Sequence, residues 1–218
     1  MRFDPGKHHR RSIRLKQYDY THMGAYFVTA CTQNRECFFG EIVDGMMRLA
    51  DVGEMIQKTW QELPEYYAGV GIDVFTIMPN HIHGIIILTY DGSDPHVGAG
   101  PPVGVGPRAY PNPITGQPQG VVPTGQSQVV APTVMSLPDV VHRFKSLTTA
   151  RYRKGVTENR WMQSCTRLWQ RNYYEHIIRN EDELNSIRQY IEDNPLKWEM
   201  DRENPTAHKT NNNEVWQV

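Results

Sequence analysis

The segment His81–Leu88, HIHGIIIL, is the feature that most restricts how this chain can fold. In a β-strand, successive side chains point to opposite faces. Ile82 and Ile86 would share one face and Ile85 and Ile87 the other, so both faces are apolar. This pattern is typical of a central strand in a covered sheet. We therefore predict a strand over this segment in the interior of such a sheet.

The spacing of apolar residues predicts five further elements around this strand. Strands rich in β-formers are predicted over 26–32, 72–78 and 173–178. Helices are predicted over 50–63 and 137–153, because apolar residues recur there at helical intervals.

A last helix is predicted to begin at Asn180, which stands three residues before Glu183 as in a capping box. This helix should end before Pro195, since the residue preceding a proline disfavours helix. The resulting order is βαββαβ followed by a helix, which is a ferredoxin-like arrangement. The predicted fold class is therefore α+β, with a ferredoxin-like βαββαβ sheet covered by helices and an extra C-terminal helix that carries Tyr190.

Residues 91–136 differ in composition from the rest of the chain. Gly and Pro occupy 17 of these 46 positions, and few side chains there could pack into a core. We interpret the stretch as a flexible, partly polyproline insertion that interrupts a single domain over residues 21–198. Residues 1–20 are interpreted as a basic N-terminal arm, and residues 199–218 as a polar C-terminal tail.

The charge of the chain is unevenly distributed. The net charge is -1, but residues 1–20 hold six basic and two acidic residues, and residues 139–179 hold nine and three. A phosphate backbone responds to such local patches, because charges act over a Debye length of about 8–10 Å. The alternative is that both patches are ordinary solvated faces.

Cysteine content and hydropathy limit the cellular setting. The three cysteines form no CxxC pair, so neither a disulfide framework nor a zinc knuckle is indicated. The sequence has no apolar run of about 18 residues, and its N-terminus lacks the apolar core of a secretion signal. We expect a cytoplasmic, nucleoid-associated protein without a membrane span.

Two histidines on the strand over 81–88 are candidate metal ligands. His81 and His83 are two residues apart, so their side chains share one face and could converge on one cation. The neighbouring Pro79 places them near the rim of the sheet rather than in its middle. The alternative is a structural histidine pair.

Tyr190 and Asn194 are four residues apart on the last helix and therefore share one of its faces. The amide oxygen of Asn194 suits a hard divalent cation. A cation held by His81, His83 and Asn194 could polarise a DNA phosphate while Tyr190 attacks it, leaving a 5′-phosphotyrosine and a free 3′-OH. The alternative role of Tyr190 is packing against the sheet.

These residues lie in stretches that resemble a known family. MPNHIHGIIIL (78–88) resembles the histidine-hydrophobic-histidine motif of single-strand endonucleases and transposases. Residues 168–198 are similar to the C-terminal signature of the REP-associated tyrosine transposases, which belong to the insertion-sequence-200 type. Residues 27–41 resemble the first strand and following turn of that family. The resemblance covers residues 11–90 and 137–198.

The resemblance implies a ferredoxin-like fold, Mg²⁺ or Mn²⁺ as cofactor, and cleavage of single-stranded DNA near hairpin-forming repeats. It makes His81 and His83 metal ligands and Tyr190 the nucleophile. Insertion-sequence relatives typically carry glutamine one turn after the tyrosine, where this chain has Asn194. The relatives differ in oligomeric state, so both a monomer and a homodimer fit, with the tyrosine serving its own or a second chain.

Eight basic residues are predicted to contact DNA: Arg11, Arg14, Lys16, Arg143, Lys145, Arg151, Arg171 and Arg179. The first three would form an arm that holds a hairpin stem. Tyr173 and Tyr174 are rival nucleophiles. Three other functions remain open: a rolling-circle-type nicking initiator, a repeat-DNA-binding protein that does not cleave, and a small metal hydrolase.

Overall fold

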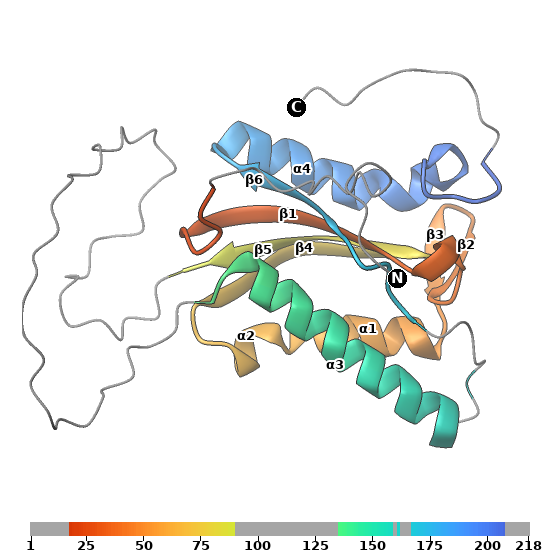
Figure 1. Cartoon of the computed structure of the whole chain (residues 1–218). Helices are drawn as coiled ribbons and strands as arrows, with labels where there is room; N and C mark the ends of the chain where they lie inside the picture. The colour runs from red at the N-terminus through yellow and green to blue at the C-terminus, as the bar shows by residue number, and fades with distance from the viewer. Residues whose placement is uncertain (1–17, 90–134, 159–160, 162–166, 208–218) are drawn as a thin grey trace, which may run out of the picture.

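The computed structural model describes residues 18–89, 135–158, 161 and 167–207 (Figure 1). The predicted arm with Arg11, Arg14 and Lys16 therefore lies outside the described residues. The same is true of residues 91–134, which make up almost all of the predicted insertion. The described parts form one sheet with helices on both faces and a short separate hairpin.

The sheet has four antiparallel strands in the order β4-β5-β1-β6. Their bounds are β1 Gly24–Cys31, β4 Val70–Met78, β5 His81–Leu88 and β6 Tyr174–Ile178. β5 has the bounds predicted from the sequence and is buried at seven of its eight positions. This strand order is that of the ferredoxin-like fold, so the predicted fold class is confirmed.

Helices cover both faces of the sheet, as the two apolar faces of β5 require. α1 (Asp51–Gln61), α2 (Leu63–Tyr66) and α3 (Leu137–Glu158) lie on one face, and α4 (Glu181–Asp193) lies on the other (Figure 1). The side chain of Asn180 accepts a hydrogen bond from the backbone N–H of Glu183 at 2.8 Å, so the predicted cap of α4 is confirmed.

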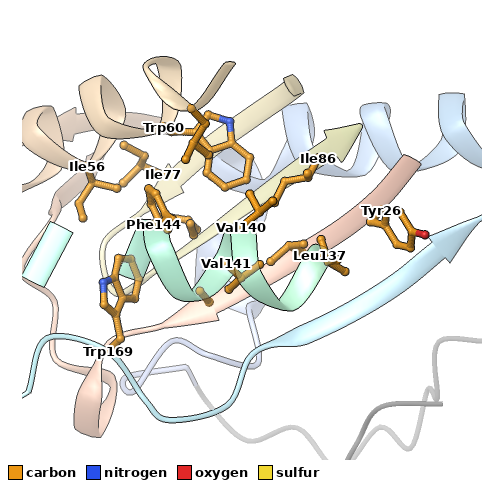
Figure 2. Close-up of a cluster of buried hydrophobic side chains, with 14 of the residues drawn as sticks. Tyr26, Ile56, Trp60, Ile77, Ile86, Leu137, Val140, Val141, Phe144 and Trp169 are labelled. Atoms are coloured by element: carbon orange, nitrogen blue, oxygen red, sulfur yellow. The ribbon is translucent and has the colours of Figure 1, made fainter. Parts of the chain in front are cut away.

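Two hydrophobic cores follow from this layering. The larger one lies under α1 and α3, and Figure 2 shows Trp60 and Phe144 within it. The smaller one lies under α4 and contains Phe27, Ile85 and Ile191. The smaller core fixes α4, the helix that carries Tyr190, onto the face of β5 that also carries the two histidines.

A hairpin that the sequence analysis did not identify follows β1. Its strands are β2 (Gly40–Val43) and β3 (Met46–Leu49), and they pair antiparallel. Asp44 and Gly45 form the turn with φ of 52° and 73°, which matches the left-handed two-residue turns that join hairpins. After α4 the chain continues as a 3-10 helix, η2 (Asn194–Met200), which has Pro195 in its first turn.

A helix that spans a membrane must be both long and apolar. In the part of the chain that the structure describes, no helix combines the length and the apolar character that a membrane-spanning helix needs.

Gly84 in β5 lies where the sheet packs closely on α1, and a substitution there tests that packing. A Cβ atom there would lie 2.5 Å from Trp60 Cζ2 and 2.9 Å from Phe75 Cδ2. The Trp60 and Phe75 rings are stacked with centroids 4.5 Å apart, so the added atom would meet a packed aromatic pair. We expect Gly84→Ala to lower the free energy of unfolding by about 1–3 kcal/mol, measured by urea denaturation.

Gly71→Ala is the matched control for this measurement. Its added Cβ would meet Ile87 Cβ at 3.4 Å, which is an ordinary contact, so the free energy of unfolding should change little. Equal effects of the two substitutions would contradict the close packing described above.

Candidate metal and nucleophile site

His81 and His83 lie at the first and third positions of β5, on the sheet face that α4 covers. Both side chains are buried, with 0% and 4% of their surface exposed. Their Nε2 atoms are 3.0 Å apart. Burial lowers the pKa of His81 to about 3, with a further contribution from Arg35, and burial also lowers the pKa of His83 well below its ordinary value. Both imidazoles are therefore neutral, which is the form that ligates metals.

Asn80 fixes the tautomer of His81. The Nδ2 group of Asn80 donates to the carbonyl oxygens of Arg35 and Glu203, at 3.0 and 2.7 Å. Its Oδ1 is therefore free to accept from His81 Nδ1, at 2.8 Å, so the proton of His81 lies on Nδ1. The lone pair of His81 is then on Nε2, facing His83. Metal-bound histidines usually have such a partner on the second ring nitrogen.

The second histidine is anchored in the same way. His83 Nδ1 lies 2.7 Å from Thr29 Oγ1, and Thr29 is its partner in the β1–β5 register. The Phe27 ring stacks on the His83 ring with centroids 5.5 Å apart. Both imidazoles are thus held with Nε2 pointing to one common point.

Asp201 brings a carboxylate to the histidine pair. Its Oδ2 lies 3.7 Å from His81 Nε2, and the ligand atoms of His81, His83 and Asp201 all lie within 4.8 Å of one another. Burial raises the pKa of Asp201. The sequence analysis did not identify Asp201, which falls in the predicted polar tail beside other acidic residues. No local signal distinguishes it from Glu199 or Glu203.

The segment that carries Asp201 is attached to the sheet through Glu203. The Arg35 guanidinium pairs with the Glu203 carboxylate at 2.9 Å, and Asn80 Nδ2 binds the Glu203 carbonyl. Asn204, buried and next in the chain, donates to the Trp198 carbonyl at 2.9 Å. Ordered contacts thus extend beyond residue 198, where the sequence analysis placed the end of the domain.

Asn194, the predicted third ligand, is also buried. Its Oδ1 has no hydrogen-bond partner within the described part of the chain. An unsatisfied buried acceptor costs about 1–3 kcal/mol, so this oxygen is a candidate for the third ligand that the sequence predicts. Asn194 also interacts with Tyr190, whose phenol it stabilises in the ionised form.

The residues fit a small divalent cation. Two adjacent ligands of an octahedral ion at about 2.1 Å lie about 3.0 Å apart, which is the observed separation of the two Nε2 atoms. Imidazole nitrogens suit first-row transition metals and a carboxylate oxygen suits harder cations, so the donor set is a mixed N/O set. His81, His83 and Asp201 therefore form a possible metal site.

Tyr190 meets this site although it is 107 residues from His83 in the chain. Its hydroxyl lies 3.5 Å from His83 Nε2, and the two rings have centroids 5.3 Å apart. Burial raises the pKa of Tyr190, and the interaction with Asn194 opposes that rise. A nucleophile of this kind needs a nearby positive charge to ionise.

The predicted DNA-contacting residues take different positions. Arg143, Arg171 and Arg179 are exposed, and Arg143 lies over the Tyr67 ring at 5.2 Å. Lys145 and Arg151 are turned into the protein and have protein partners there.

Arg151 and Lys145 both make contacts within the protein that stabilise the fold. Arg151 pairs with Glu62 at 2.6 Å and donates to Thr59 Oγ1 at 2.8 Å, joining α3 to the end of α1. Lys145 donates to backbone carbonyls, and burial lowers its pKa to about 8. Of the rival tyrosines, Tyr173 is partly buried against the larger core and Tyr174 is exposed.

Known proteins resemble this chain at several levels. A sequence profile of the family described as "Transposase IS200 like" matches residues 128–194, a stretch that contains Tyr190 and Asn194. A Haemophilus influenzae protein named only as uncharacterised is 39% identical over 203 residues, which are 92% of this chain and 96% of that protein.

Two solved structures are more distant. A REP-associated tyrosine transposase bound to a REP hairpin is 16% identical, with a TM-score of 0.49 over 85% of this chain and 74% of that one. A crystal structure from Deinococcus radiodurans R1, provisionally named a transposase, is 16% identical, with a TM-score of 0.38 over 83% and 96% of the two chains.

Mn²⁺ titration of single variants tests which side-chain oxygens bind the cation. We expect Asp201→Asn and Asn194→Ala each to weaken Mn²⁺ binding at least about tenfold, the scale on which the loss of even an outer partner acts. Calorimetry or Mn²⁺ electron paramagnetic resonance would measure the affinity. Glu199→Gln removes an exposed carboxylate from the same segment and should leave the affinity unchanged. An unchanged affinity in Asp201→Asn would exclude Asp201 from the ligand set.

Proposed function

The chain belongs to the family of IS200-like transposases, and from that premise we propose that it is a metal-dependent enzyme that nicks and rejoins single-stranded DNA at hairpin-forming repeats. The proposal depends on one observation, the Tyr190 hydroxyl 3.5 Å from His83 Nε2. This contact brings the proposed nucleophile to the proposed cation site. Phosphodiester transfer needs both at one phosphorus atom.

The cation site has one task in this proposal. Mg²⁺ or Mn²⁺, when bound, would neutralise the charge that develops on the scissile phosphate. His81 and His83 would hold it through Nε2, and Asp201 and Asn194 offer oxygens. Asn80 contacts His81 Nδ1 and Thr29 contacts His83 Nδ1, and these contacts keep the two rings in the ligating orientation.

Tyr190 carries out the covalent step. Its hydroxyl oxygen forms a bond to phosphorus, and the bond from phosphorus to the 3′ oxygen of the preceding nucleotide breaks. The phenol releases its proton, and the departing 3′ oxygen takes one up. The products are a 5′-phosphotyrosine and a free 3′-OH. Because the phosphotyrosine retains the energy of the phosphodiester, a second 3′-OH can reverse the step and rejoin DNA without ATP.

The rest of α4 positions the nucleophile. Ile187 and Ile191 anchor the helix in the smaller core, and the Phe27 ring meets the Tyr190 ring edge-on at 5.9 Å. These contacts restrict the side-chain rotation of Tyr190, so its hydroxyl stays beside His83. Because all these residues belong to one chain, we propose that the tyrosine serves its own cation site and that a monomer suffices.

The nature of the substrate is supported by sequence and charge. Residues 78–88 resemble the histidine-hydrophobic-histidine motif of single-strand endonucleases and transposases. Residues 168–198 resemble the C-terminal signature of REP-associated tyrosine transposases, which act near hairpin-forming repeats. The exposed Arg143, Arg171 and Arg179 are available to phosphates. A DNA substrate would place the protein with the nucleoid.

Covalent trapping tests the proposal. A labelled hairpin oligonucleotide with unpaired flanks is incubated with the protein and Mn²⁺, and adducts are resolved on a denaturing gel. We expect an adduct with wild type and none with Tyr190→Phe, because the substitution removes only the attacking oxygen. Hairpin affinity should be unchanged by that substitution.

Tyr174→Phe is the matched control, since Tyr174 is the exposed rival phenol, and it should keep the adduct. An adduct that survives in Tyr190→Phe would assign the nucleophile to another residue. Tight binding without an adduct on any repeat would instead indicate a DNA-binding protein that does not cleave. Nicking without rejoining would favour a rolling-circle-type initiator.

A further inference from the structure

The pairing of β6 with β1 is interrupted just before β6 begins. Thr29 is paired with Tyr174, and the next bridge joins Thr32 to Trp169. Two residues of β1 therefore face four residues, 170–173, of the partner segment. The extra residues form a bulge, and bulges of this kind redirect side chains at the edge of a sheet.

The side chain of Lys145, on α3, binds the backbone of the bulge. Its Nζ lies 2.6, 3.3 and 3.2 Å from the carbonyl oxygens of Gln170, Arg171 and Asn172. An ammonium group has three protons, so one side chain can serve all three carbonyls. The backbone of the bulge is therefore fixed by α3.

A turn with unusual backbone angles faces the bulge. Asn34 and Arg35 have φ of 59° and 58°, a left-handed backbone conformation that residues other than glycine rarely adopt. The turn is held by Thr32 Oγ1, which donates to the Glu36 carbonyl at 2.8 Å, and by Asn80 Nδ2 on the Arg35 carbonyl. Such strain persists where the surroundings enforce it, and it is concentrated at functional sites.

The turn and the bulge line a shallow, open surface groove of about 510 Å³, here called the bulge groove. Its lining residues are all polar: Gln33, Asn34, Arg35, Gln170, Arg171 and Asn172. The volume lies in the range of roughly 300–1,000 Å³ that is common for small-ligand sites. Those sites are mostly apolar, and this one is not.

The chemistry of the lining matches a nucleotide. A side-chain amide has both donors and acceptors, so it can pair with the edge of a base. A guanidinium binds phosphate oxygens with two parallel hydrogen bonds. The amides of Gln170 and Asn172 therefore provide partners for a base, and the Arg171 guanidinium provides one for its phosphate.

The bulge groove adjoins the possible metal site. Arg35 lines the groove and pairs with Glu203, two residues from Asp201. Asn80 binds the Arg35 carbonyl on one side and His81 on the other. A DNA strand whose phosphate lies at the histidines could thus place a neighbouring nucleotide in the groove.

We propose that the bulge groove binds one unpaired nucleotide next to the scissile phosphate and discriminates between bases at that position. This inference rests on the proposed function, since it assigns part of the same substrate. Gln170 and Asn172 contact the base edge, Arg171 contacts a phosphate, and Lys145 is a positioning residue that acts through the bulge.

Base preference in adduct formation is the test. Oligonucleotides that keep the hairpin and vary one unpaired position at a time beside the cleavage site are compared in rate. We expect wild type to prefer one base about tenfold or more at one position, the discrimination of a single good base contact. Gln170→Ala and Asn172→Ala should reduce that preference to about twofold or less.

Two further variants separate the groove from general effects. Gln57→Ala removes an exposed amide from α1, on the face of the sheet opposite α4 (Figure 1), and should keep the full preference. Lys145→Met keeps every lining side chain but removes the hydrogen bonds to the bulge, so it should lose the preference. Thermal melts identify variants that fail to fold. If Lys145→Met fails to fold, the test still rests on Asn172→Ala, which changes an exposed side chain.

The outcomes distinguish the inference from the proposed function. Adducts that form with an unchanged base preference in Gln170→Ala and Asn172→Ala overturn the groove assignment and leave the proposed function intact. No adduct with any oligonucleotide overturns both. Loss of preference in the groove variants, with adducts still formed and Gln57→Ala unaffected, supports the assignment.

Discussion

Two buried imidazole nitrogens, His81 Nε2 and His83 Nε2, face each other at 3.0 Å, and the rest of the structure is arranged around that contact. Burial keeps both rings neutral, so at least one lone pair points into the space between them. Asn80 determines which nitrogen of His81 carries the proton, and Thr29 anchors His83. Because His81 Nε2 is an acceptor, the 3.0 Å contact is favourable only when His83 Nε2 carries a proton or when a cation lies between the two nitrogens.

Three parts of the chain meet at this contact for separate physical reasons. β5 supplies the histidines because its alternation places them on the face under α4. The smaller core fixes α4 and thereby brings Tyr190 within 3.5 Å of His83. The segment after η2 arrives through polar contacts, with Glu203 bound by Arg35 and Asn80. Apolar packing thus sets the position of the phenol, while hydrogen bonds and an ion pair set that of the carboxylate.

This division explains what could be predicted from the sequence. β5 and α4 were predictable because apolar periodicity and the Asn180 cap are local signals. The approach of Asp201 to His81 was not, because it depends on tertiary contacts of a polar segment without periodicity. The inward direction of Lys145 has the same origin: a basic residue on an amphipathic helix looks solvent-exposed until the carbonyls of a distant bulge are placed beside it. The β2–β3 hairpin carries an Asp-Gly turn signal, but its strands are too short for alternation to be recognised.

The two residues whose oxygens are proposed to bind the cation, Asn194 and Asp201, lie at the two ends of η2. The insertion-sequence relatives that the sequence resembles typically carry a glutamine where this chain has Asn194, whose side chain is one methylene shorter. Asn194 stands at the junction of α4 and η2, and its buried oxygen lacks a hydrogen-bond partner in the described residues. Asp201 directly follows η2, so the helix that begins with the shorter amide ends by delivering a carboxylate to His81 at 3.7 Å. A carboxylate also lowers the net charge of a bound divalent cation, which an amide does not. The two oxygens are therefore not equivalent: the amide is adjacent to the phenol, and the carboxylate sets the charge of the site.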